Sequence, residues 1–256
     1  MQNRGKLTDR LSAWLQGFLS RPIRDFDPPA SYSAAQMHSA LEPGDVLLVE
    51  GNLRISSLIK YITQSTWSHA ALYVGPQPGA QGDDPPVLVE AELSQGVVLS
   101  PLSKYVGFHT RICRAIGLRA DDRKRIVAYA LRRLGHDYDL KHVIDLARHQ
   151  LARPTLATAV QRGLRRLGSG EPTRVICSTL IAQAFQSVRY PILPSRRSAP
   201  CAESRPEQVD DCVEEAWEAR HSSLFAPRDF DVSPYFTIVK PLPVEDFDYT
   251  QVRWAA

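Results

Sequence analysis

The chain of 256 residues has few cysteines, and nothing in their arrangement indicates a metal site or a disulfide framework. Cys113, Cys177, Cys201 and Cys212 form no CxxC pair and show no repeating spacing. Such a pattern is typical of reduced thiols in a cytoplasmic protein. No apolar run approaches the roughly 18 residues that a membrane-spanning helix needs, and no secretory signal with a small-residue cleavage site is visible. We therefore expect a cytoplasmic protein that touches the inner membrane surface at most.

Excess charge of one sign is also lacking. The formal net charge is +3, so composition gives no argument for a nucleic-acid partner. Positive charge is local instead: between residues 148 and 174 the chain carries a group of arginines against the single acid Glu171, namely Arg148, Arg153, Arg162, Arg165, Arg166 and Arg174. This group could form a rim that attracts phospholipid head groups or an acidic cell-wall fragment, or it could be a solvated helix face and loop.

The N-terminal region has a helical apolar pattern of its own. Residues 7–19 place apolar side chains on one face of a helix: Leu7, Leu11, Trp14, Leu15 and Phe18. Two interpretations remain open, a helix docked on the surface of the domain and an interfacial helix that makes peripheral membrane contact. The proline-rich segment 21–30 that follows is typical of a linker.

The rest of the chain alternates between strand-like and helix-like segments. Apolar runs bounded by turn residues predict strands over 46–50, 68–75, 87–93, 96–100, 110–116 and 236–240. Helical periodicity predicts helices over 54–62, 121–134 and 140–151, with Asp121 and Asp122 as the cap of the second. After Tyr190 the prolines predict irregular structure with a short helix over 209–219. This succession favours an α+β fold with an antiparallel sheet.

The stretch 174–188 predicts a helix packed into the core, because its apolar residues recur at helical spacing. Cys177 falls in the first turn of this helix. A thiol there feels the positive end of the helix dipole, which favours the thiolate, and a thiolate is a competent nucleophile when a histidine is close. The alternative is a small buried hydrophobic residue, which is the common role of a free cysteine.

A histidine and a carboxylate stand on two of the predicted strands. His69 begins an apolar strand, and Glu90 lies inside the apolar run 87–91, where an unpaired carboxylate would cost several kcal/mol. If the two strands pair, Glu90 can orient the His69 imidazole toward Cys177, as the third member of a catalytic triad does. Glu92 points to the same face of the strand and is the alternative third member.

These segments together resemble a known family. Pro43-Gly44-Asp45-Val46, Ser68-His69-Ala70-Ala71-Leu72-Tyr73-Val74-Gly75, Val89-Glu90-Ala91 and Cys177-Ser178-Thr179-Leu180-Ile181 occur in the order of the circularly permuted NlpC-type papain-like hydrolases, the YiiX/YebB-like group. Lecithin–retinol acyltransferase-like proteins share this order, in which the cysteine helix follows the histidine strand. The resemblance covers about residues 42–190, and segment 225–235 is similar to the same bacterial branch.

The resemblance implies a permuted papain-like fold, with an antiparallel sheet or barrel packed against the nucleophile-bearing helix. By position, Cys177 would be the nucleophile, His69 the general base and acid, and Glu90 the orienting residue. The implied domain division is an N-terminal helix and linker over 1–40, the catalytic domain with an irregular C-terminal region over 41–245, and a tail over 246–256.

Three functions compete on these grounds. The first is a cysteine hydrolase or acyltransferase without a cofactor, acting on an amide or ester bond of a cell-wall peptide or lipid-linked acyl group. Its oxyanion would be held by the Cys177 backbone N–H, with Tyr61 and Trp67 as candidates for a second donor. The second is a non-catalytic module that binds such lipids or peptides. The third, a metal site built from the cysteine, histidine and glutamate, lacks a fourth ligand and the local spacing of zinc sites.

Overall fold

A computed structural model describes residues 21, 32–92, 95–136, 177–200 and 213–241. Four predicted features lie outside the described residues: the helix over 7–19, the linker over 21–30 beyond Arg21, the helix over 140–151 and the arginine group between 148 and 174. The domain boundaries at 40 and 245 likewise stay predictions.

A six-stranded sheet in the order β4-β3-β2-β1-β5-β8 forms the centre of the molecule, and every neighbouring pair is antiparallel. The sheet is open, because β4 and β8 are its two edges, so of the two expected forms it is the sheet and not the barrel. The strands begin and end within two residues of the predicted bounds: β1 Val46–Val49, β2 His69–Tyr73, β3 Pro86–Glu92, β4 Gly96–Pro101, β5 Thr110–Ala115 and β8 Phe236–Val239.

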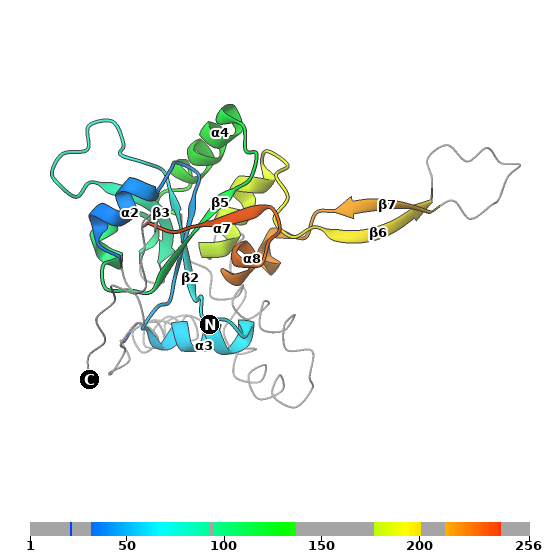
Figure 1. Ribbon diagram of the computed structural model, residues 1–256, viewed down its shortest axis with the longest axis horizontal. Coiled ribbons are helices and arrows are strands. Elements are labelled where there is room, and N and C mark those ends of the chain that lie inside the picture. Colours follow the sequence, from blue (N-terminus) through cyan, green and yellow to red (C-terminus); the bar gives the residue numbers. More distant parts are fainter. Residues whose placement is uncertain (1–20, 22–31, 93–94, 137–176, 201–212, 242–256) are drawn as a thin grey trace, which may run out of the picture.

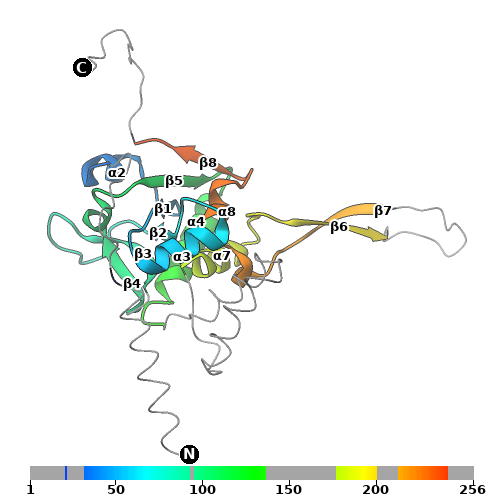
Figure 2. The ribbon, with the colours of Figure 1, turned by 90° about the horizontal axis from the view of Figure 1, so that it is seen from below.

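Both faces of this sheet are covered (Figures 1 and 2). Helix α7 (Cys177–Gln186) and helix α4 (Ala120–Leu131) contact one face, where Ala70 and Leu72 of β2 enter their apolar cluster. Helix α2 (Ala34–Ala40) and the 3-10 helix η1 (Leu102–Tyr105) cover the other face, where Ala71 and Tyr73 are buried. The continuous apolar strands follow from this burial on two sides.

Local sequence signals explain the ends of the helices. Helix α2 was not predicted, although Ser33 and Gln36 form a capping box at its start. Helix α3 (Arg54–Thr63) agrees with its prediction. In α4, Asp121 and Asp122 lie inside the first turn, where carboxylates favour the dipole, and the residue at the cap position is Arg119. The expectation that the aspartates themselves form the cap was therefore wrong.

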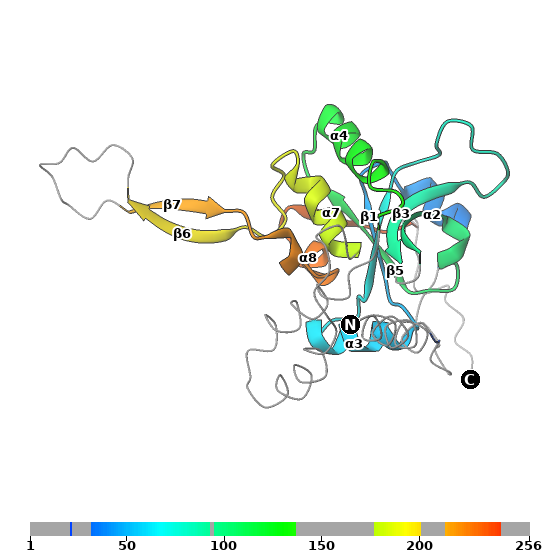
Figure 3. The same cartoon turned by 180° about the vertical axis from the view of Figure 1, so that it is seen from behind.

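Between Tyr190 and the last strand, the prediction of irregular structure with a short helix was wrong for residues 195–200 and 213–218. Strands β6 (Ser195–Pro200) and β7 (Val213–Glu218) pair with each other as an antiparallel ribbon that projects from the body (Figures 1 and 3). Pro191 and Pro194 precede β6 and Pro200 ends it, so none of these prolines interrupts the ladder in its middle. The pairing across the ribbon decides the structure of 213–218, against the local helical pattern.

The C-terminal segment packs against helix α7, which begins with Cys177. The 3-10 helix η2 (Ser222–Leu224) and the short helix α8 (Arg228–Asp231) lie beside α7. Ser178 Oγ donates to the Phe225 carbonyl at 2.6 Å. The ring centroid of Phe185 in α7 lies 6.4 Å from that of Phe230, in a tilted pair, and 5.2 Å from that of Phe236, in a T-shaped pair. These contacts bury aromatic area around α7 and hold its orientation.

The segment Pro43-Gly44-Asp45-Val46 has a structural explanation. Gly44 adopts φ +94°, a conformation that residues with a side chain rarely enter. The carboxylate of Asp45 accepts from the backbone N–H of Glu42 at 2.8 Å and pairs with Arg114 at 2.7 Å. This turn fixes the start of β1, which lies next to β2 in the sheet.

Candidate active site

Cys177 is the first residue of α7 and is 4% exposed. The helix begins there as expected, with Leu180, Ile181, Ala184 and Phe185 buried against the sheet. The positive end of the helix dipole and the free N–H groups of the first turn therefore lie at the thiol.

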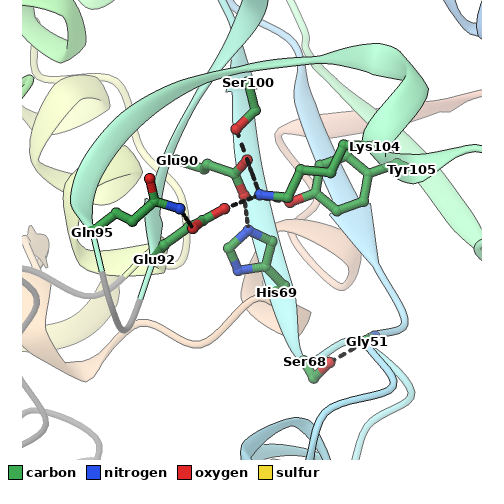
Figure 4. Close-up of polar contacts among 9 residues, drawn as sticks. All are labelled: Gly51, Ser68, His69, Glu90, Glu92, Gln95, Ser100, Lys104 and Tyr105. Atoms are coloured by element: carbon green, nitrogen blue, oxygen red, sulfur yellow. Dashed lines mark hydrogen bonds and ion pairs between the residues drawn. The ribbon is translucent and has the colours of Figure 1, made fainter. Parts of the chain in front are cut away.

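His69 is the first residue of β2, at the end of the sheet where residues from both of its covering layers meet. The preceding residue fixes this strand end: Ser68 Oγ accepts from the Gly51 N–H at 2.9 Å (Figure 4). The imidazole is hydrogen-bonded to Glu90, and the neighbouring Cys177 thiolate raises the pKa of the ring. With a side chain 21% exposed, it is open to a substrate.

Glu90 is buried, with no exposed side-chain area, and its carboxylate is fully engaged. Oε2 lies 2.6 Å from His69 Nε2 and also accepts from the Tyr105 hydroxyl. Oε1 accepts from Lys104 Nζ at 2.6 Å. Because a carboxylate only accepts, the histidine carries a proton on Nε2, which leaves Nδ1 for the thiol.

Glu92 has other partners. Its Oε1 accepts from Lys104 Nζ and its Oε2 accepts from Gln95 at 2.7 Å (Figure 4). No contact between Glu92 and the imidazole is present among the described residues. Of the two predicted orienting residues, the geometry brings Glu90 to His69 and turns Glu92 toward the lysine.

Cys177 and His69 shift each other's pKa values in opposite directions. Burial alone would lower the pKa of His69, but the Cys177 thiolate and the Glu90 carboxylate outweigh it and raise this pKa to about 10. Burial alone would raise the pKa of Cys177, but the imidazolium and the backbone N–H groups of Ala70 and Ser178 lower it below the ordinary thiol value. The electrostatics therefore favour thiolate and imidazolium over thiol and neutral imidazole.

Glu90 is likewise held in its charged form, as a carboxylate. Burial would raise the pKa of Glu90, but the imidazolium of His69 and the ammonium of Lys104 hold it below its ordinary range. Burial and the adjacent Glu90 raise the pKa of Tyr105 well above its usual value, so its hydroxyl stays a donor.

Lys104 and Tyr105 are the site residues that sequence reasoning missed. Both come from η1, a turn that is too short to show periodicity. The signal that pointed to them was indirect: a carboxylate predicted to be buried in a strand requires partners, and one histidine satisfies only one of its oxygens.

Trp67 and Tyr61, the two candidates for a second oxyanion donor, differ in exposure. Trp67 is 3% exposed, and its indole N–H donates to Asp231 Oδ2 at 2.9 Å. Since an indole has a single donor, Trp67 cannot supply an oxyanion hole in this arrangement. Tyr61 is 56% exposed on α3. Cys177 is the first residue of α7, where backbone N–H groups lack an intrahelical acceptor, so its N–H stays a proposed oxyanion donor.

The other described cysteine belongs to the core. Cys113 on β5 is fully buried, and burial raises its pKa to about 12, so it stays a thiol. Within the described ranges no group of three or more histidine, cysteine, aspartate or glutamate side chains could hold a metal ion.

Residues 40–199 match the model of a family described as a permuted papain-like amidase enzyme, YaeF/YiiX, C92 family. The chain belongs to this family. C92 members are papain-like amidases, so this chain is a cysteine hydrolase with a permuted papain-like fold, in which the cysteine helix follows the histidine strand. The finer assignment to an NlpC type, and the likeness to lecithin–retinol acyltransferases, go beyond this match.

Among solved structures, this C92 chain is similar to one titled metalloprotein yiiX from Escherichia coli O157:H7. The two share 17% sequence identity with a TM-score of 0.46, over 78% of this chain and 96% of the other. No curated protein matches the sequence. In the part of the chain that the structure describes, no helix has the length and apolar character to cross a membrane.

Proposed function

We propose that the chain cleaves an amide or ester bond through a covalent acyl-enzyme on Cys177. His69 is the general base and acid in this proposal, and Glu90 orients its ring. The observation that carries the proposal is the position of His69, whose Nε2 lies 2.6 Å from Glu90 Oε2 and whose pKa is raised by the neighbouring Cys177 thiolate.

The ion pair defines the order of the chemical steps. The Cys177 thiolate attacks the carbonyl carbon, and the carbonyl oxygen takes the negative charge beside the Cys177 N–H. The C–N or C–O bond then breaks, and the leaving group takes the proton from the His69 imidazolium. Neutral His69 next deprotonates a water, which attacks the thioester, and release of the acid restores thiolate and imidazolium.

A thiolate–imidazolium site acts on a carbonyl carbon, which is present in both amide and ester bonds. We propose a cell-wall peptide or a lipid-linked acyl group as the acyl donor, with water or a second molecule as the acceptor. The partly exposed His69 gives an acceptor access to the acyl-enzyme, and the buried Glu90 is too enclosed to contact it.

The proposal is tested by the pH dependence of iodoacetamide alkylation at Cys177, followed by mass spectrometry. We expect a midpoint well below the free-thiol value of about 8.5, and an upward shift in His69→Ala. An activated ester should form a thioester adduct that intact-mass spectrometry detects in wild type and not in Cys177→Ser, which tests formation of the acyl-enzyme. A normal midpoint that is indifferent to His69 would instead favour a binding module without catalysis.

A further inference from the structure

Lys104 occupies a position that the proposed chemistry does not yet explain. Its ammonium lies 2.6 Å from Glu90 Oε1 and also bonds Glu92 Oε1, so one cation joins two carboxylates (Figure 4). Ser100 Oγ lies 3.5 Å from the same nitrogen, and the Tyr105 ring centroid lies 5.3 Å from it. The lysine side chain is 33% exposed, whereas Glu90 is fully enclosed.

This arrangement fixes the direction of the Glu90 carboxylate. Lys104 takes Oε1, while Tyr105 and His69 share Oε2. Lys104 and Tyr105 are neighbours in η1, so a single turn supplies both supports. With Lys104 on Oε1 and Tyr105 on Oε2, both oxygens of the carboxylate are held in place, and Oε2 also faces the His69 ring.

The charges along this line alternate in sign. His69, Glu90, Lys104 and Glu92 follow one another by direct contact, and the Cys177 thiolate at the far side of His69 is stabilised by the imidazolium. Tyr105 also contacts the Glu90 carboxylate, as a neutral hydrogen-bond donor. Removing the charge of Lys104 or of Glu92 therefore changes the electrostatic potential at Cys177 and His69.

We propose that Lys104 is a positioning residue that aims Glu90 at His69 and, together with its counter-ion Glu92, sets the pH at which the thiolate–imidazolium pair forms. This inference rests on the proposed function of Cys177 and His69. It assigns Glu92 a role opposite in sign to that of Lys104, since the acidic side chain partly neutralises the lysine.

The test measures the midpoint of Cys177 alkylation by iodoacetamide against pH in four full-length proteins: wild type, Lys104→Met, Lys104→Arg and Glu92→Gln. Loss of the cation makes the site more negative, which favours the protonated thiol, so Lys104→Met should raise the midpoint by about one pH unit. Lys104→Arg keeps the charge and should return the midpoint to near that of wild type. Glu92→Gln removes a negative charge and should lower the midpoint, by less because Glu92 is farther from the thiol.

Midpoints that shift in opposite directions in Lys104→Met and Glu92→Gln would support the proposal, because a merely structural role of the two residues does not predict the direction of a shift. Equal midpoints in wild type, Lys104→Met and Glu92→Gln, together with a clear dependence on His69, would overturn this inference and leave the proposed function intact. A wild-type midpoint indifferent to His69 would instead refute the proposed function. Should Lys104→Met fail to fold, Glu92→Gln alone decides, since no shift or an upward shift contradicts the proposal.

Discussion

Glu90 Oε2 lies 2.6 Å from His69 Nε2, although the pairing of β2 with β3 does not place these residues directly opposite each other. Leu72 pairs with Val89 and Tyr73 with Leu88, and the same register continued toward the start of β2 sets Glu92 opposite His69. Glu90 is then the diagonal neighbour, within reach of a long side chain. The contacts from η1 explain the choice, because they hold Glu90 toward the ring and draw Glu92 away from it.

This geometry predicts different outcomes for two matched amide substitutions. Glu90→Gln should reduce turnover by about two to three orders of magnitude, because the imidazolium loses its charged acceptor and its fixed orientation. Glu92→Gln should reduce turnover far less at the pH optimum. The measurement is kcat/KM for each variant on one amide or ester substrate. Comparable losses in both variants would contradict the assignment of Glu90 as the orienting residue.

The ion pair predicts a broad pH optimum. The lowered pKa of Cys177 keeps the thiolate at pH values where an ordinary thiol is protonated. The pKa of His69, about 10, keeps the imidazolium present until the pH rises through that value, whereas an ordinary imidazole loses its proton near pH 6.5. A profile of kcat/KM should therefore fall on the acid side below the free-thiol pKa and on the alkaline side only near pH 10.

An alkaline limb close to pH 6.5 would contradict this prediction, since it would mean that His69 loses its proton as an isolated imidazole does. His69→Ala serves as the control, because its residual reactivity should follow the titration of an ordinary thiol.

Sequence patterns were sufficient to predict the elements that are buried in the core. The apolar runs of 46–50, 68–75 and 87–93 became β1, β2 and β3, and the helical stripe after Cys177 became α7. These elements contain Cys177, His69 and Glu90, and the physical need of a buried carboxylate for a partner predicted the contact between Glu90 and His69.

The remainder depends on contacts between distant segments. Lys104 and Tyr105 lie in a four-residue turn where a lysine looks like any solvated surface charge. The ribbon of β6 and β7 is stabilised across its strands, so its local pattern favoured a helix at 209–219 that does not form over the described 213–218. Which glutamate contacts His69 likewise depends on the hydrogen bonds from Lys104 and Tyr105, which a local sequence pattern does not reveal.

The C-terminal segment beyond the C92 match is predicted to support the histidine side of the site. Asp231 of α8 accepts from Trp67 Nε1 at 2.9 Å and from Arg111 at 2.6 Å, and Trp67 stands two residues before His69. Asp231→Ala leaves the indole N–H buried without its acceptor, so the free energy of unfolding should fall by about 1–3 kcal/mol. Urea unfolding followed by circular dichroism measures this loss, and the rate of Cys177 alkylation should fall as well.

A double-mutant cycle isolates that contact. Trp67→Phe removes the donor, so adding Asp231→Ala to it should cost less than Asp231→Ala alone, with a coupling of about 0.5–3 kcal/mol. Strictly additive losses would show that the indole and the carboxylate do not stabilise each other.

Gly51 is predicted to tolerate no side chain, because the end of β1 approaches the segment before β2 closely there. A Cβ at this position would lie 2.4 Å from Ser56 Oγ and 2.9 Å from Ser68 Oγ. Gly51→Ala should therefore displace the Ser68 hydroxyl that fixes the start of β2, and should lower the free energy of unfolding by about 1–3 kcal/mol. Adding Ser56→Ala removes the closest atom and should recover part of this loss. Equal stabilities of wild type and Gly51→Ala in urea unfolding would mean that the strand end can shift freely.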